Sequence, residues 1–265
     1  MRILRIVALH FQQALQYRSR SFLWFLLALL NPAIYLLFWR AAINSGHIIG
    51  TKVIFNDIAS YYLLVVIAGA LLIAHVEEDV AMIDIKQGEL VKYLLKPYSY
   101  FWMKFIEEIP YRVIQGTYGW IGLLIMLLIF GNVLKVVHDP VQIIYAICIS
   151  IAAFFLSFVF KMIIGITTFW IDDFSGLQQL MFVLISLFAG FIQPIEYFHP
   201  VLRSIALATP FPYMIYYPVV AWTGVLPVSQ ALNVLLIQLA IISVFAYIYA
   251  VLWKKGVKEF TGVGQ

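Results

Sequence analysis

The stretch WIGLLIMLLIFG, residues 120 to 131, decides the fold class of this chain. Its apolar residues follow one another almost without a break, whereas a strand of a membrane barrel alternates polar and apolar side chains. The run ALLIA, residues 70 to 74, does not alternate either. Backbone polar groups inside a bilayer must bond within their own segment, so helices are the spanning structure that remains. We therefore expect an all-α integral membrane protein.

The composition of the whole chain agrees with that class. Of its 265 residues, 64% are hydrophobic and 11% are charged, and the mean hydropathy is +0.96. Soluble domains are roughly 45 to 50% apolar and about 25% charged. At about 20 apolar residues per crossing, the chain has room for about six helices and for no separate soluble domain. Its formal charge of +4 gives no reason to expect nucleic-acid binding.

Uninterrupted apolar windows predict one transmembrane domain, residues 1–265, with six spans. The windows lie near residues 22–44, 58–76, 113–131, 141–160 or somewhat beyond, 174–195 and 229–253. Before them, residues 1–20 repeat apolar side chains at helical spacing, with arginines and glutamines elsewhere on the wheel. This pattern is typical of a helix lying in the membrane interface. A frayed basic tail is the alternative.

The basic residues indicate the orientation of the spans. With the amino terminus inside, the inner side holds twelve of them and the outer side four. Both termini are therefore expected in the cytoplasm. The 31 residues between Pro140 and Asp172 would rise about 46 Å as one helix, so we expect Lys161 to reach the inner interface and snorkel. A buried Lys161 at mid-membrane is the alternative and would be a functional candidate.

The chain lacks the residue patterns of an enzyme or an autonomous pump. No glycine is followed by lysine, so a phosphate-binding loop ending in Gly-Lys is absent. The five histidines lack metal-ligand spacing, Cys148 is the one cysteine, and there is no Gly-x-Ser-x-Gly motif. By our reading, every acidic residue falls in a loop or at a helix end, which argues against an ion-coupled transporter. We expect no catalytic residue, metal or cofactor in this chain.

One segment is unusually charged for a membrane protein. Residues 77 to 112 hold 12 of the 30 charged residues. Gly88 permits a tight bend there, and Pro97 should stop any helix that follows. The apolar face of that short helix would comprise Ile85, Leu90, Tyr93 and Leu94. Such a helix, presented to the cytoplasm, could dock on a soluble partner; a solvated interfacial loop explains the pattern equally well.

Two stretches carry a resemblance to a known family. IKQGELVKYLLKPYSYFWMKFIEEIPYR, residues 85 to 112, and TTFWIDDFSGLQQLMFVLISLFAGFIQPIEYFHPVLRSIALATPFPYMIYYPVVAWTG, residues 167 to 224, resemble the permease subunits of type-2 ATP-binding-cassette exporters. The likeness is strongest to the six-span bacterial branch that is often encoded as two related permeases beside one ATPase. It covers nearly the whole chain, through loose apolar patterns.

The resemblance implies that the loop between spans two and three carries a coupling helix that contacts the ATPase. The coupling residues would be Lys86, Gly88, Glu89, Leu90, Lys92, Leu94, Lys96 and Pro97. It also implies a re-entrant segment after span five, where six prolines between Pro194 and Pro227 break any single helix. The outer-gate residues would be Phe198, Pro210, Phe211, Tyr213, Tyr216 and Tyr217. An aromatic interfacial loop is the alternative.

Two smaller features complete the set of candidate residues. Asp172 and Asp173 lie at the inner turn before span five, where a carboxylate can cap the next helix or contact the ATPase. Gly116, Gly119 and Gly122 form a small-residue stripe that lets another helix approach closely.

These patterns predict the permease subunit of an ATP-driven exporter. The resemblance implies two copies of a cytoplasmic ATPase, which would bind ATP and magnesium, and a second permease, either this chain again or a related one. An ion-coupled secondary transporter and a non-transporting docking or assembly subunit are the alternatives.

Overall fold

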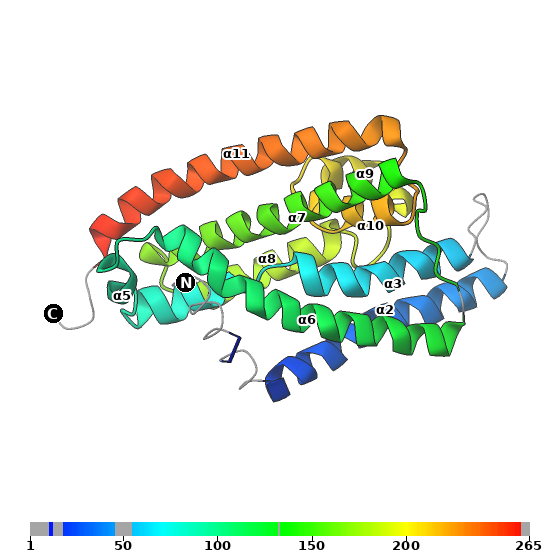
Figure 1. Cartoon of the computed structure of the whole chain (residues 1–265), viewed down its shortest axis with the longest axis horizontal. Helices are drawn as coiled ribbons and strands as arrows, with labels where there is room; N and C mark the ends of the chain where they lie inside the picture. Colours follow the sequence, from blue (N-terminus) through cyan, green and yellow to red (C-terminus); the bar gives the residue numbers. More distant parts are fainter. Residues whose placement is uncertain (1–10, 13–17, 46–54, 132, 261–265) are drawn as a thin grey trace.

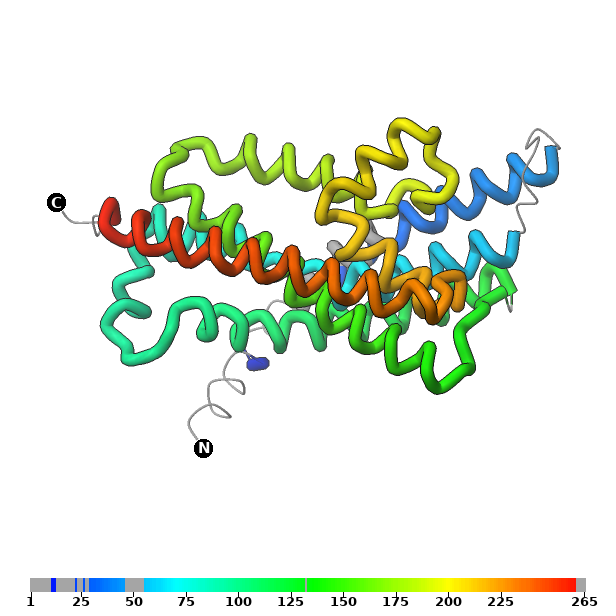
Figure 2. Tube along the Cα trace, turned by 90° about the horizontal axis from the view of Figure 1, so that it is seen from above, coloured from blue at the N-terminus to red at the C-terminus, as the bar shows by residue number. Residues whose placement is uncertain are grey.

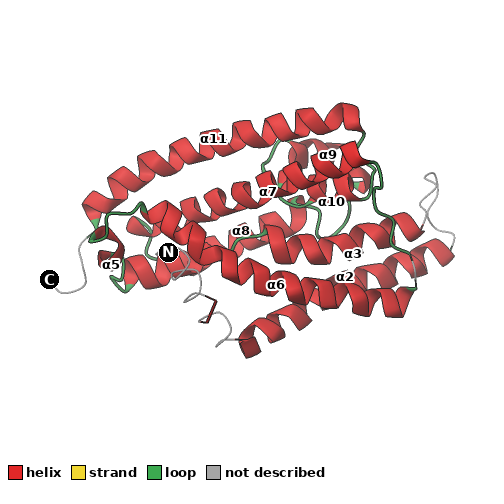
Figure 3. Ribbon diagram, viewed as in Figure 1, coloured by secondary structure: helices red, strands yellow, loops and turns green. Residues whose placement is uncertain are grey.

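The computed structural model describes residues 11–12, 18–45, 55–131 and 133–260. Every regular element among these residues is a helix, as the non-alternating apolar runs predict (Figure 3). The main helices are α2 (Arg18–Asn44), α3 (Phe55–Leu72), α6 (Tyr100–Phe130), α7 (Pro140–Ile166), α8 (Phe174–Phe188) and α11 (Val228–Glu259). The short ones are α4 (Val76–Glu78), η1 (Asp79–Lys86), α5 (Val91–Leu94), η2 (Thr167–Phe169), η3 (Ile195–Tyr197), α9 (Pro200–Leu207), η4 (Phe211–Tyr213) and α10 (Tyr216–Trp222).

The long helices run along one axis of the molecule (Figure 1). Four segments of the described chain are long and apolar enough to cross a membrane, namely Phe55–Lys86, Tyr100–Phe130, Pro140–Phe169 and Val228–Glu259. Two more helices accompany them: α8, which is apolar but only 15 residues long, and α2, which has 27 residues. The chain is therefore an all-α, multi-pass membrane protein. The predicted interfacial helix, residues 1–20, lies mostly outside the described residues.

Two helix boundaries differ most from the apolar windows. The third long helix begins at Tyr100, well before the window at 113–131, and its 31 residues extend about 46 Å at about 1.5 Å per residue. It continues through a charged stretch because partners inside the protein pair those charges. In contrast, α8 ends at Phe188, before the window's limit at 195, since Gly190 takes a left-handed φ of +93° that favours glycine.

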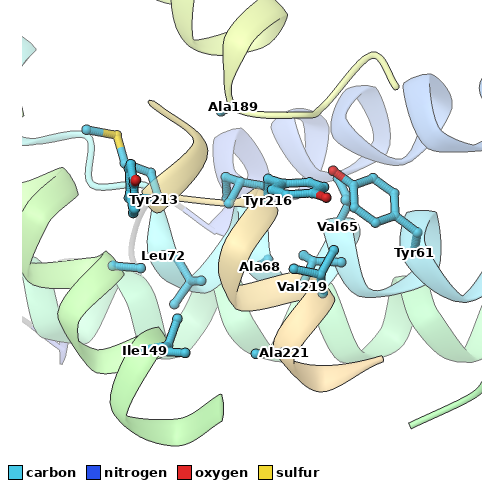
Figure 4. Packing of buried hydrophobic residues seen from close by; sticks show 14 of the residues in the cluster. Tyr61, Val65, Ala68, Leu72, Ile149, Ala189, Tyr213, Tyr216, Val219 and Ala221 are labelled. Carbon is cyan, nitrogen blue, oxygen red and sulfur yellow. The ribbon is translucent and has the colours of Figure 1, made fainter. Parts of the chain in front are cut away.

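The centre of the bundle is filled with side chains. Figure 4 shows Tyr61 and Val65 of α3 beside Tyr216 and Val219 of α10, with Ile149 of α7 close by. These residues are all buried and belong to one hydrophobic cluster. Tyr61 fixes the chain after α8, because its hydroxyl donates a 2.7 Å hydrogen bond to the carbonyl of Gly190.

The predicted glycine stripe lies where α6 packs against α3. Gly116, Gly119 and Gly122 are all buried. A Cβ added to Gly119 would lie 3.1 Å from the Cβ of Ala70 on α3, and one added to Gly116 would meet Leu71. The close approach is therefore within one subunit.

The bundle has two distinct ends (Figures 1 and 2). At one, which we call the α5 end, α5 and the last turns of α11 lie together. At the other, the α9 end, α9 and α10 lie near the first turns of α11.

Candidate coupling surface and its buried base

An apolar surface projects at the α5 end. Val91, Leu94 and Leu95 follow a spacing of three and four residues, which places them on one side of a helix, and Tyr98 lies in the bend that follows the helix. All four side chains are at least 41% exposed, and Leu95 is 81% exposed. We call these four residues the α5 face. Exposed apolar side chains that gather in one patch mark an interaction site more often than isolated ones do.

The predicted apolar face of this helix is confirmed for Ile85, Leu90 and Tyr93, which pack in one hydrophobic cluster, and is wrong for Leu94. Leu90 and Ile85 are buried in a hydrophobic cluster with Phe158 and Met162, whereas Leu94 points outward. The reason is that the regular helix is one turn long and the chain leaves the packed bundle after Leu90. It returns at Tyr100, so most side chains in between face outward.

Gly88 and Pro97 have the structural effects that the sequence predicts. Gly88 takes a left-handed φ of +80°, which makes the bend before α5. Helical hydrogen bonding continues as far as the amide of Lys96 and ends beside Pro97.

Charged side chains surround the α5 face. Lys92 pairs with Glu89 beside it, and the Lys96 ammonium lies 5.4 Å from the centre of the Tyr93 ring. Lys86 forms a 3.1 Å ion pair with Asp172 of the turn before α8. Among the predicted coupling residues, Leu94 lies on the α5 face, Leu90 alone is fully buried, and the others form the rim and the turn.

Tyr93 is the side chain that ties α5 to the bundle. Its hydroxyl donates to the Glu107 carboxylate at 2.9 and 3.0 Å, and its ring packs edge to face on Tyr100 with centroids 5.3 Å apart. Lys104 places its ammonium 4.8 Å from the same ring. Burial raises the pKa of the Tyr93 hydroxyl, so it stays protonated and able to donate at physiological pH.

A buried lysine holds the elements beneath α5 together. Lys104 of α6 forms ion pairs with Asp84 of η1 at 2.6 Å and with Glu107 at 3.2 Å. Tyr100 donates a 2.6 Å hydrogen bond to Asp84 and stacks on Trp253 of α11, with ring centroids 4.6 Å apart. We call Tyr93, Tyr100, Lys104, Asp84 and Glu107 the buried base. Through it, α5 is bonded to α6, and α6 is bonded in turn to η1.

A second ion pair closes the end of α3. Arg112 pairs with Glu108 at 2.9 Å and donates to the carbonyls of Ala70 and Ile73 at 3.1 and 2.5 Å. Glu108 also accepts the amide of His75 at 3.0 Å. A guanidinium there satisfies carbonyls that a helix end leaves unbonded.

The expectation that Lys161 snorkels to the interface was wrong. Lys161 is only 7% exposed and pairs with Glu77 of α4, which is 3% exposed. Lys161 can be buried because the Glu77 carboxylate supplies the opposite charge. The second oxygen of that carboxylate makes no hydrogen bond with any described residue. The expectation that all acidic residues sit in loops or at helix ends was also wrong, since Glu108 lies within α6 and Asp84 within η1.

The charged segment, residues 77 to 112, therefore contains two groups of charged residues with different roles. Five of its charged residues are buried and hold helices together: Glu77, Asp84, Lys104, Glu108 and Arg112. Glu107 belongs to the buried base, and the other six lie around the α5 face or in the chain that leads to it. The spacing of four between Glu108 and Arg112 is visible in the sequence and typical of a helical ion pair. The pairing of Glu77 with Lys161 spans 84 positions and leaves no local signal.

The two aspartates at the turn before α8 have separate contacts. Asp173 caps α8, accepting a 2.6 Å hydrogen bond from the Ser175 hydroxyl and a 3.2 Å bond from the Gly176 amide. These bonds, led by that of Ser175, hold the pKa of Asp173 below its usual value. Asp172 is exposed and reaches Lys86. It connects this turn to the chain leading into α5.

The predicted outer-gate residues gather at the α9 end. Phe198, Phe211, Tyr213 and Tyr216 are buried, and Pro210 and Tyr217 are partly buried. They belong to a run of short helices broken by prolines, as the sequence indicates. Gln238 of α11 fixes this run by donating to the carbonyls of Tyr213 at 2.8 Å and Ile149 at 3.2 Å. Their role as a gate stays a prediction.

Comparison with known proteins gives one finding at the level of a family. The model of a family described as "ABC-2 family transporter protein" matches residues 29–264. No curated protein matches the chain. Within the described residues, no group of three or more histidine, cysteine, aspartate or glutamate side chains could hold a metal ion.

Proposed function

Because the chain belongs to the ABC-2 family of transporter proteins, we propose that it is the permease of an ATP-driven exporter, docked to a separate ATPase through the α5 face. Membership makes the chain a membrane component of an ABC transporter. The docking site, the partners and the direction of transport belong to the proposal.

The observation that carries the proposal is an exposed apolar surface on a rigidly held base. Val91, Leu94, Leu95 and Tyr98 are exposed, although the neighbouring Leu90 is buried. Protein interfaces commonly pair an apolar centre with a polar rim. Here Glu89, Lys92 and Lys96 supply the rim, so the patch has the composition of a docking site for a soluble partner.

The energy source is assigned to the partner. No glycine of this chain precedes a lysine, so ATP and magnesium would bind in the ATPase. Two ATPase copies, one beneath each of two permeases, would approach each other when ATP binds. The chain itself is expected to carry out no hydrolysis.

The buried base supports a rigid transmission of that movement. A displacement of α5 would act on Glu107 through Tyr93, and Lys104 would carry it to Asp84 of η1. Since η1 follows α3 and Glu107 lies on α6, the two spans would move with the docking helix as one body. Rigid-body motion of this kind can open a path alternately to the two sides of a membrane.

The packed interior supports a path between two permeases. Large side chains such as Tyr62, Leu156 and Phe158 are fully buried within the bundle. A path down the centre of a single copy would need this core to be rebuilt. We therefore place the path at the contact between two permeases, formed by a second copy of this chain or by a related chain.

The distribution of basic residues supports the orientation. Lysines 86, 92 and 96 belong to the α5 segment, and Lys254, Lys255 and Lys258 lie in the last turns of α11, at the same end. Short loops rich in lysine and arginine stay in the cytoplasm. The α5 end would thus face the cytoplasm of a bacterium, with the protein in the inner membrane.

Purification of the tagged chain from its native membrane in mild detergent tests this proposal. Mass spectrometry of the retained proteins should recover a soluble ATPase with a phosphate-binding loop, together with a second permease or a second copy. If the chain came out alone even after cross-linking, the proposal would be wrong, and transport driven by an ion gradient would be the function to test.

A further inference from the structure

A pocket opens at the α9 end, away from the α5 face. Its volume is about 120 Å³, several times the roughly 30 Å³ that one molecule occupies in liquid water. Elements far apart in the sequence form it: η3, α9, α10 and the first turn of α11. Its polar lining comes from Arg203, Tyr216, Tyr217 and Gln230, and Leu207 and Leu226 belong to its apolar wall.

The geometry of α9 explains why an arginine lines this pocket. Arg203 and Leu207 are four residues apart, which places them on one side of the helix, and both line the pocket. Ala206 is fully buried against the core. Val201 and Ile205 form a third, exposed apolar side. The helix therefore presents Arg203 between the packed core and an apolar surface suited to lipid.

The charge of Arg203 is not neutralised by an ion pair within the described part of the chain. Arg203 lies close enough to Tyr216 and Tyr217 for its charge to act on both, and Glu196 also lies within electrostatic range. Lys135, another cation of this end, is instead held by Asp57 at 2.5 Å.

We propose that this pocket binds the phosphate ester group of an amphiphile, with the phosphate on Arg203 and the adjoining hydrocarbon against the apolar wall. The guanidinium offers a planar fork that matches two phosphate oxygens. The Gln230 amide and the tyrosine hydroxyls offer further hydrogen bonds to a group that has more acceptor oxygens than a carboxylate. Ligand pockets commonly combine an apolar wall with a few placed polar groups.

Binding of a fluorescent phosphatidylglycerol to the purified full-length permease in detergent tests the proposal. A diacylglycerol with the same fluorophore and chains serves as the probe that lacks phosphate. We expect phosphatidylglycerol to bind at least tenfold more tightly than diacylglycerol. Arg203→Gln should remove that preference and leave the melting temperature unchanged, because the side chain is exposed.

Two variants of the same end separate a local site from general charge. Lys135→Gln removes a cation that is already paired, so it should leave the affinity unchanged. Glu196→Gln removes a carboxylate that acts on Arg203, so phosphatidylglycerol should bind at least as tightly as to the wild type. If Lys135→Gln weakened binding as much as Arg203→Gln, net charge would explain the affinity and the site would be refuted.

Competition identifies the source of the phosphate. Displacement by glycerol phosphate at similar concentrations would assign the site to soluble phosphate esters, whereas displacement by phosphatidylglycerol alone would assign it to lipid. Equal affinity for the two fluorescent probes, or an unaltered preference in Arg203→Gln, would overturn the proposal. The measurement uses the permease without its ATPase, so its result tests the phosphate site independently of the proposed docking of α5.

Discussion

Leu95→Asp is the substitution that the α5 face makes most informative. Leu95 is 81% exposed, so its side chain contributes little to the packing of the permease itself. Its neighbours on the same surface, Val91 and Leu94, stay in place because Tyr93 holds the helix to Glu107. The substitution should therefore change the proposed docking surface without unfolding the permease.

The expected effect on docking can be worked out from burial. Burying one leucine side chain in the interface contributes about 1.5 to 3 kcal/mol to the free energy of association. Placing a carboxylate in the same apolar contact adds a desolvation cost. A total loss of about 3 kcal/mol corresponds to roughly a hundredfold weaker association, at about 1.4 kcal/mol for each factor of ten. Leu95→Met keeps the apolar volume and should lose less than tenfold.

The assay is the affinity of the purified permease, in nanodiscs, for its separately purified ATPase. Leu95→Asp and Leu95→Met should both melt at the wild-type temperature, which shows that the fold is intact. If Leu95→Asp bound the ATPase as tightly as the wild type, Leu95 would lie outside the interface and the reasoning from exposure would be refuted. A lower melting temperature in both variants would contradict the claim that Leu95 does not contribute to the stability of the permease.

The buried charges and close contacts give three further predictions. Lys161→Met should destabilise the permease by about 3 to 5 kcal/mol, because the Glu77 carboxylate stays buried without its cation; adding Glu77→Leu should restore most of the melting temperature, and no recovery would argue against the pair. Gly165→Ala should cost about 1 to 3 kcal/mol in the same melting assay, since its Cβ would lie 2.8 Å from the Cβ of Val80; an unchanged transition would refute that contact. The lowered pKa of Asp173 means that its cap stabilises α8 above the ordinary value of 3.8 and is lost as the pH falls through the lower folded value. The protection of the first-turn amides of α8 against exchange, measured relative to their intrinsic rates, should therefore fall over that acidic range, and Asp173→Ala should show low protection at every pH.

The helical class could be predicted because a bilayer leaves the backbone few choices. Apolar runs such as residues 120–131 must satisfy their own hydrogen bonds, and α6 covers that run. The long helical stretch after Pro140 was also predicted from the sequence, and α7 and η2 continue to Phe169. Physical constraint acts locally in both cases, so a local pattern is enough.

The burial of charge could not be predicted, since it depends on distant partners. Lys161 was expected at the interface because an unpaired lysine is costly to bury. Its partner, Glu77, lies 84 positions away in the sequence, on a different helix. Lys104 and Glu108 likewise looked like loop charges, although α6 carries both into the protein. Such pairs become visible only when the packing of the helices is known.

Helix α5 shows an intermediate case. Its bend at Gly88 and its end beside Pro97 follow from local chemistry. Which side of it faces outward does not, because four residues are too few for an apolar period to fix the direction. The sequence therefore predicts the place of α5 and the packing of Ile85, Leu90 and Tyr93 correctly, but it does not predict that Leu94 turns outward.

Site-specific photo-cross-linking from position 95 tests the central claim most directly. A photoreactive phenylalanine analogue would replace Leu95 in native membranes, with Leu128, an exposed residue of α6 outside the α5 segment, as the matched position. Mass spectrometry of the adducts should identify a soluble ATPase with a phosphate-binding loop at position 95 and none at position 128. Absence of an ATPase adduct at position 95, or equal capture at both positions, would contradict docking through the α5 face.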